Sequence, residues 1–344
     1  MLKYEVHNAN FNKGYNFPFI LIYPEKMNNN VKIFVEGNNS VNYEKRDINN
    51  NIIGYQNFEE QIKDATKFAE QICKYEDGKN FNIGYMYQQL NQPIVIPIIE
   101  RCDAEHEGEY YTQMLGRNVL LDNTTKFANL TQQVVSMVED AKNICLSKNN
   151  TIKIDKKSGL CGFSASGVFA SRMLFAEPES FDVCLSMCSN AVQPLPVEEL
   201  NGIKLPYPLG IADYEKIFKK PFNIEEYKKA KQMFFVGEKE DNRKYNIIKS
   251  PRLHDKMVHD KFVEVYGDIS IQQRQRKISQ IMQNLGMDQT VSLIVPGGHN
   301  FGGKSKYILN FAKAITSSTK DAKPLSQFIQ PSITNTQIEQ DFTM

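Results

Sequence analysis

The stretch GLCGFSASGVFASRML, residues 159–174, joins a glycine-rich strand pattern to an apolar helix pattern. It places Ser164 and Ser166 among glycines and alanines at the point where the strand ends. Small residues on both sides of a serine permit a turn too tight for larger side chains, and such a turn exposes a nucleophilic serine at the end of a sheet. The alternative is a strand–turn–helix junction whose glycines only relieve crowding. Ser164 is the centre of the G-x-S-x-S pattern, so the motif favours Ser164 over Ser166.

Short apolar runs alternate with longer helical patterns along most of the chain. QPIVIPIIE (92–100) is continuously apolar, as expected of a strand buried on both faces of a parallel sheet. NFEEQIKDATKFAEQICKYED (57–77) instead spaces its apolar residues at the helical period. This alternation predicts the α/β class, with a doubly wound, mostly parallel sheet and helices on both faces. The other predicted strands cover 17–24, 31–37, 158–163 and 181–189 and begin the segments 231–242 and 290–303; the other predicted helices cover 124–148, 269–287 and 306–318.

The domain organisation follows from where this alternation is interrupted. Residues 1–318 are predicted to form one α/β domain. The segment at about 190–230 breaks the rhythm and is predicted as a small lid-like insertion, with an inert surface excursion as the alternative. From 319 onward the chain is rich in Ser, Thr, Gln and Pro without periodicity, so 319–344 is predicted as a loosely attached C-terminal tail.

The composition excludes several classes of partner. Hydrophobic residues at 41% and charged residues at 24% are ordinary for a globular protein. A net charge of +1 gives no electrostatic attraction to nucleic acid or to an anionic membrane. No apolar run has the length that spans a bilayer, and the first residues lack the apolar core of a signal peptide. We therefore expect a cytoplasmic protein without a nucleic-acid or membrane partner; its oligomeric state stays open.

The cysteines give no sign of disulfides or of a metal site. Six cysteines occur without a C-x-x-C pair, in a chain too large to need disulfides for stability, which predicts reduced thiols. Cys184 and Cys188 with a distant histidine are an alternative metal site, but CLSMC fits the apolar end of a strand better. The sequence contains no phosphate-binding loop. We therefore expect neither a metal nor a cofactor.

Four polar features fall at the predicted ends of strands. Ligands of a parallel α/β sheet bind at the carboxyl ends of its strands. Ser164 follows SGLCGF, an acidic cluster follows MFFVG, His299 follows VSLIVPGG, and GNNS (37–40) follows VKIFVE. The chain order serine, acid, histidine is the order found in α/β-hydrolases and not in other serine-protease folds.

The chain resembles the α/β-hydrolase superfamily, in particular its serine esterase branch. Within that branch it is similar to bacterial polyhydroxybutyrate depolymerases and carboxylesterases. The resemblance extends from about residue 30 to residue 303, with Ser166 where the fifth position of the motif usually has glycine. The stretches that carry it are VEGNNS (35–40), IVIPIIERC (94–102), YYTQMLGRNVL (110–120), GFSASGVFASRM (162–173), LPYPLGIADYEKIFKKPFN (205–223), FFVGEKEDN (234–242) and PGGHNF (296–301).

The resemblance implies a Ser–His–acid triad. Ser164 is expected to be the nucleophile and His299 its base, since His299 alone among five histidines lies in a glycine-flanked loop after a late strand. The acid is expected in the turn after MFFVG. Spacing after the glycine points to Glu240, whereas residue type points to Asp241 because aspartate is the commoner partner. We slightly prefer Asp241 and keep Glu240 as the alternative.

The oxyanion hole and the substrate pocket complete the expected site. Two backbone N–H groups must face the developing negative oxygen. We expect them from Ala165, which follows the nucleophile, and from Asn38 or Asn39; the alternative is an asparagine-rich turn without a role. We also expect Arg117 and, from the insertion, Tyr207, Leu209 and Tyr214 to line the pocket, with an inert packing cluster as the alternative.

These expectations describe a serine hydrolase that cleaves a small carboxylic ester through an acyl-enzyme. Amides and thioesters use the same groups and stay open as substrates. The alternative function is a binding or scaffold protein that kept the fold and lost the activity, because a fold alone does not establish a function.

Overall fold

A computed structural model describes residues 1–38, 44–49, 51–74, 88–101, 114–189, 191–241, 256–267, 269–300 and 304–316. Within these residues the central sheet has eight strands in the order β1-β2-β7-β4-β9-β10-β13-β14. Strand β2 pairs antiparallel with β1 and β7, and every other neighbouring pair is parallel. The expected mostly parallel sheet is confirmed. The strands are β1 (Leu2–His7), β2 (Phe19–Pro24), β4 (Phe34–Glu36), β7 (Ile94–Pro97), β9 (Ser158–Phe163), β10 (Phe181–Met187), β13 (Lys231–Gly237) and β14 (Thr290–Val295).

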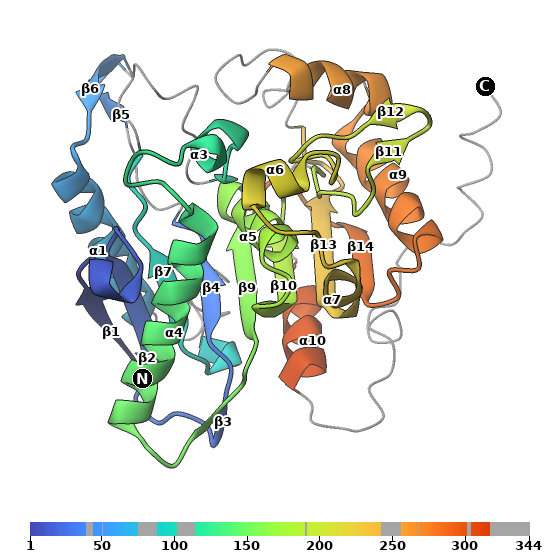
Figure 1. The fold of residues 1–344 in the computed structure, drawn as a ribbon. Helices are drawn as coiled ribbons and strands as arrows, with labels where there is room; N and C mark the ends of the chain where they lie inside the picture. The colour runs from blue at the N-terminus through green and yellow to red at the C-terminus, as the bar shows by residue number, and fades with distance from the viewer. Residues whose placement is uncertain are drawn as a thin grey trace.

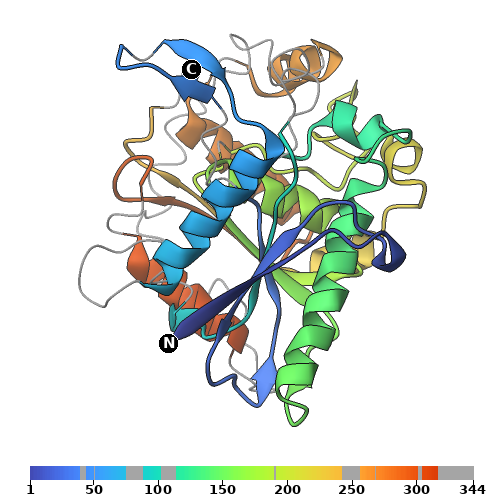
Figure 2. The same cartoon turned by 90° about the vertical axis from the view of Figure 1, so that its left-hand side faces the viewer.

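Helices cover both faces of this sheet, as a doubly wound fold requires (Figures 1 and 2). One face packs against α4 (Leu130–Lys148), α5 (Ala165–Ala176) and α9 (Ile271–Asn284). The other packs against α1 (Phe58–Cys73) and α10 (Ser305–Thr316). Strand β2 shows how one segment serves both layers. Phe19 and Leu21 belong to the first core and Ile20 and Ile22 to the second, because alternate side chains of a strand point to opposite faces.

The predicted insertion lies between β10 and β13 and is packed into the first core. It contains a hairpin of β11 (Glu199–Leu200) and β12 (Ile203–Lys204) and the short helices α6 (Tyr214–Phe218) and α7 (Ile224–Lys229). Its aromatic side chains surround Phe175 of α5 in a cluster of ring contacts. Burial of such aromatic rings contributes strongly to a core, so this cluster fixes the insertion to the sheet's helical layer.

Several elements were not expected from the sequence. The edge strand β1 is half polar, LKYEVH, and its antiparallel pairing with β2 is what makes it a strand. Helix α8 (Lys256–Tyr266) was not predicted either. The remaining short elements are η1 (Phe11–Lys13), α3 (Arg117–Leu121), and two small sheets formed by β3 (Asn30–Val31) with β8 (Lys153–Ile154) and by β5 (Glu44–Arg46) with β6 (Ile52–Tyr55).

Some expectations fall on parts of the chain that the structure does not describe. They include Asn39, Cys102 and the tail 319–344, which lie outside the described residues. Within the described part, no helix combines the length and the apolar character needed to cross a membrane.

Candidate active site

The turn between β9 and α5 holds Ser164 in a strained backbone conformation. Ser164 has φ 60° and ψ −122°, a combination that residues with a side chain rarely adopt. Its neighbours must be small. A β-carbon at Gly162 would lie 2.2 Å from the Ser166 carbonyl oxygen, and one at Gly167 would lie 2.9 Å from that of Met187. The glycines therefore permit the tight turn that lifts Ser164 to the carboxyl end of β9.

Ser166, the second serine of the motif, has a structural role. It is 1% exposed, and its hydroxyl donates to the Phe163 carbonyl and accepts from the Phe163 N–H, both at 2.8 Å. Both bonds close the turn between strand and helix. Backbone groups of Phe163 thus occupy the hydroxyl of Ser166, whereas the hydroxyl of Ser164 contacts the ring of His299.

His299 connects Ser164 to a buried carboxylate. Its Nε2 lies 3.0 Å from Ser164 Oγ, and its Nδ1 lies 2.6 Å from Glu240 Oε1. The three residues come from three strand ends, after β9, β13 and β14. A histidine that contacts a hydroxyl through one nitrogen and a carboxylate through the other can take the hydroxyl proton while the carboxylate fixes its orientation.

Glu240 is held as an ionised acceptor. Its side chain is fully buried, and its Oε2 accepts a hydrogen bond of 2.9 Å from the Gly237 N–H. Burial raises the pKa of Glu240, but the hydrogen bonds from His299 and Gly237 outweigh it, so the pKa lies below its usual value. A carboxylate that stays ionised is the form that stabilises an imidazolium ion.

Comparisons with known proteins bear on the fold. No protein-family model matches the sequence, and no curated protein does. Among solved structures, poly(aspartic acid) hydrolase-1 from Sphingomonas sp. KT-1 matches with a TM-score of 0.50 and 12% identity, over 90% of this chain and 97% of that chain. The chain has the α/β-hydrolase fold.

Other solved structures match with lower TM-scores. The Staphylococcus aureus fluorophosphonate-binding serine hydrolase FphF matches with a TM-score of 0.46 and 10% identity, over 92% of this chain and 99% of that chain. The poly(3-hydroxybutyrate) depolymerase LpqC from Bordetella parapertussis matches with a TM-score of 0.44 and 13% identity, over 96% and 94%.

The preference for Asp241 as the acid is corrected by the geometry. Glu240, not Asp241, makes the hydrogen bond to His299, and Asp241 is exposed. The cause is the turn after β13, in which the Glu240 N–H donates to the Gly237 carbonyl at 3.1 Å. This turn directs the side chain of its fourth residue back toward the strand end. Spacing was the better guide, because the turn conformation decides which carboxylate reaches the histidine.

The expected oxyanion donors lie on adjacent elements. Ala165 is the first residue of α5, where backbone N–H groups have no partner within the helix. Strand β4, which leads into Gly37 and Asn38, pairs directly with β9, so the two segments leave the same edge of the sheet side by side. Gly37 is required there, since a β-carbon would lie 2.7 Å from the Phe169 ring. Assigning Ala165 and Asn38 to an oxyanion hole stays a prediction.

The pocket residues expected from the insertion are core residues instead. Tyr207 and Tyr214 are 0% and 1% exposed. The Tyr207 hydroxyl donates to the Leu115 carbonyl at 2.8 Å, and the Tyr214 hydroxyl donates to the Ala176 carbonyl at 2.7 Å. Leu209 is also buried, at 4% exposure. These side chains offer no surface to a substrate because they are buried. The two tyrosine hydroxyls find the hydrogen-bond partners that buried polar groups need in the backbone.

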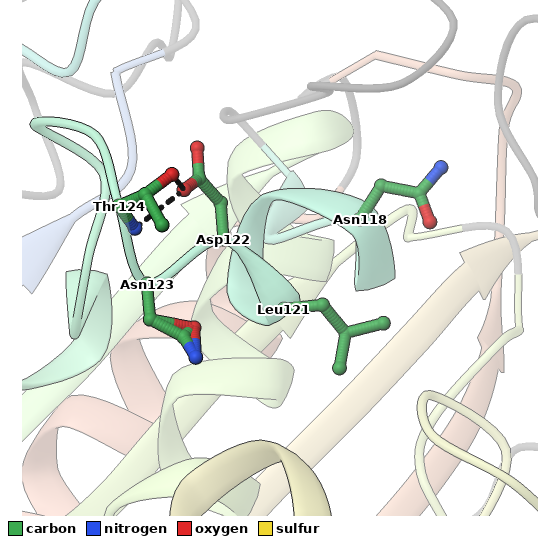
Figure 3. A pocket seen from close by; sticks show the side chains of 5 residues that line it. All are labelled: Asn118, Leu121, Asp122, Asn123 and Thr124. Atoms are coloured by element: carbon green, nitrogen blue, oxygen red, sulfur yellow. Dashed lines mark hydrogen bonds between the residues drawn. The ribbon is translucent and has the colours of Figure 1, made fainter.

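Arg117 has a structural role as well. Its guanidinium forms an ion pair with Asp213 and lies 3.4 Å from the Tyr207 carbonyl oxygen. The pair joins α3 to the insertion. Beyond Arg117, the end of α3 borders a surface hollow of about 280 Å³, lined by Asn118, Leu121, Asp122, Asn123 and Thr124 (Figure 3). Ser164, Glu240 and His299 do not line this hollow. The Asp122 carboxylate in it accepts hydrogen bonds from Thr124 and Thr125.

Cys188, which the sequence offered only as part of an alternative metal site with Cys184 and a distant histidine, lies beside Glu240 and His299. One potential ligand atom each of Cys188, Glu240 and His299 lies within 4.8 Å of the others. This donor set suits a thiophilic divalent cation only with the cysteine as thiolate. Burial raises the pKa of the Cys188 thiol far above its ordinary value, which disfavours the thiolate. The expectation of a site without metal stays a prediction. Cys184 and Cys188, the pair of the alternative metal site, pack in the two different cores and are separated.

Proposed function

We propose that the chain is a serine hydrolase that cleaves a small carboxylic ester through an acyl-enzyme. The observation that carries this proposal is the continuous hydrogen-bonded chain from Ser164 through His299 to the buried Glu240. A serine hydroxyl is a weak nucleophile at neutral pH and needs a base within hydrogen-bonding reach. The preference for an ester follows the resemblance of the sequence motifs to serine esterases.

The reaction would begin when His299 Nε2 takes the proton of Ser164 as Oγ attacks the ester carbonyl. The oxyanion of the tetrahedral intermediate would be stabilised by the N–H of Ala165 and by an N–H after β4, at Asn38 or Asn39. Collapse breaks the carbon–oxygen bond to the alcohol, which leaves with the proton from His299. Water, deprotonated by the same nitrogen, then hydrolyses the acyl-enzyme and restores Ser164.

The alternative function is a binding or scaffold protein. Two features favour catalysis. A non-reactive serine has no need of the strained backbone at φ 60°, and a fully buried carboxylate would be costly to keep without a function for its partner histidine. Strain retained at a residue that contacts a histidine base supports a role in chemistry.

Hydrolysis of p-nitrophenyl esters of increasing acyl length, beside amide and thioester analogues, tests the proposal. We expect ester turnover by the wild-type protein and a loss of about four to six orders of magnitude in Ser164→Ala, because the acyl-enzyme route is lost. Ser166→Ala is the matched control and should lose far less turnover than Ser164→Ala, because it alters the turn and leaves the nucleophile in place. Absence of turnover on every analogue would favour the scaffold function.

A further inference from the structure

The loops that carry the acid and the base contain glycines at their closest approach. A β-carbon at Gly237 would lie 2.4 Å from the Gly297 carbonyl oxygen and 2.6 Å from that of Gly298. The loops are also joined by the backbone, since Glu238 N–H donates to Val295 at 2.8 Å and Lys239 N–H to Gly297 at 3.0 Å. Glycine makes this close approach possible but leaves the backbone with more freedom than other residues would.

Lys304 binds the backbone on both sides of the histidine. It is 0% exposed, and its ammonium donates to the carbonyls of Gly298 at 2.6 Å and Asn300 at 2.5 Å. Its own carbonyl accepts the N–H groups of Tyr307 and Ile308 at the start of α10. Lys304 therefore ties the carbonyl groups of the two residues on either side of His299 to the first turn of a packed helix. Hydrogen bonds from a charged donor are stronger than those between neutral groups.

Gln272 does the equivalent for the acid. It lies in the first turn of α9, and its Nε2 donates to the carbonyls of Gly237 at 2.8 Å and Glu240 at 3.0 Å, with that of Glu238 at 3.3 Å. These carbonyls belong to the turn that directs the Glu240 side chain toward His299. One amide group on a helix thus spans both ends of the acid turn.

We infer that Lys304 and Gln272 are positioning residues for the base and the acid, an inference that rests on the proposed function. Both donate to backbone carbonyls and not to the groups that would react. Lys304 holds the loop of His299 to α10, and Gln272 holds the turn of Glu240 to α9; the two helices pack on opposite faces of the sheet. The side chains that the two loops bring to the site are Glu240 and His299, which lie there beside Ser164 and Cys188. A displacement of about 1 Å in a catalytic group can lower a rate by as much as about a hundredfold.

The test compares four single variants in ester hydrolysis. Lys304→Met and Gln272→Leu remove the donors and keep the approximate side-chain volume. Their matched controls are Lys277→Met, which loses a bond to the Val265 carbonyl, and Gln275→Leu, which loses a bond to the Ser292 hydroxyl. We expect kcat to fall by about 10- to 100-fold in the first pair with KM within about threefold, and kcat within about threefold in the controls.

A second comparison separates positioning from a general structural role. If Gln272 acts through Glu240, then Gln272→Leu in a Glu240→Gln background should lower kcat by at most about twofold further, because interacting residues are not additive. The same fold-loss in both backgrounds would overturn the inference. Gln272 is only partly buried, so this comparison decides the matter even where Lys304→Met does not fold.

The outcomes also distinguish this inference from the proposed function. Ester turnover in the wild type with unchanged kcat in folded Lys304→Met and Gln272→Leu would overturn the inference alone. Absence of Ser164-dependent turnover in the wild type would overturn the proposed function on which it rests.

Discussion

The strand–helix turn at Ser164 and the insertion between β10 and β13 use hydroxyl groups in opposite ways. The Ser164 hydroxyl contacts a titratable ring nitrogen from a strained backbone position. The Tyr207 and Tyr214 hydroxyls lie inside the core and donate hydrogen bonds to backbone carbonyls. A backbone carbonyl is too weak a base to take the proton of a hydroxyl group. Ser166 belongs with the tyrosines, because its partners are the backbone groups of Phe163. The partner of a hydroxyl, rather than its place in a motif, separates the proposed nucleophile from the structural hydroxyl groups.

The largest effect in this comparison is expected from the partner of His299. Glu240→Gln should lower turnover by about 10⁴-fold with little change in folding, because the histidine loses the group that fixes its tautomer and orientation. Asp241→Asn should change turnover by less than about threefold. Steady-state kinetics of the two variants, with circular dichroism as the folding control, would check this. A severe loss in Asp241→Asn with a mild one in Glu240→Gln would reverse the assignment.

An intermediate effect, on stability instead of turnover, is expected in the insertion. Tyr207→Phe and Tyr214→Phe each leave a buried carbonyl without its donor, which should lower the free energy of unfolding by about 1–3 kcal/mol. KM and kcat should stay within about twofold, because neither hydroxyl faces a substrate. Denaturant unfolding and ester kinetics measure the two quantities separately. A large rise in KM at unchanged stability would return these tyrosines to the substrate pocket.

The smallest effect, on the pH dependence of stability, concerns Glu36 at the end of β4. This buried side chain differs from the hydroxyl groups compared above because one of its oxygens lacks a hydrogen-bond partner among the described residues. It is 3% exposed, and the oxygen concerned is Oε2. Burial raises the pKa of Glu36 well above its ordinary value, so the folded state keeps a proton that the unfolded state releases. Stability should therefore fall as pH rises above the ordinary pKa of a glutamate, until the raised pKa is reached.

Glu36→Gln removes this dependence because an amide does not ionise. Between pH 5 and 8 its melting temperature, relative to that of the wild type, should rise by about a few degrees. The control is Glu238→Gln, whose carboxylate is exposed. If the melting temperatures of Glu36→Gln and the wild type changed by the same amount between pH 5 and 8, the assignment of a protonated carboxyl group would be contradicted.

The sequence predicted the parts of the molecule that depend on local pattern. Apolar runs and helical spacing gave most of the central strands and the helices α1, α4, α9 and α10, and the small residues around Ser164 identified the turn. Strand β1 escaped prediction because its pairing, not its composition, makes it a strand. Which of Glu240 and Asp241 contacts His299 depends on the conformation of a turn, which the sequence does not specify. An aromatic residue of the insertion has the same sequence pattern whether it lines a ligand pocket or packs in a core.

Lys304 and Gln272 show a further limit of sequence reasoning. Each contacts a backbone carbonyl, and a carbonyl group carries no signature in the sequence. Gln272 lies 32 to 35 residues from the residues of the acid turn whose carbonyls it contacts, and no local pattern in the sequence links the two segments. Such contacts become visible only when the fold places a helix beside a loop.

The most direct test of the central claim is the site of reaction with a fluorophosphonate. We expect one adduct for each wild-type chain, located by mass spectrometry on Ser164. Labelling should persist in Ser166→Ala, and it should slow sharply in Glu240→Gln, because formation of the adduct needs the same histidine base. An unlabelled wild-type protein, or an adduct on Ser166 that survives Ser164→Ala, would contradict the assignment of Ser164, His299 and Glu240 as a catalytic triad.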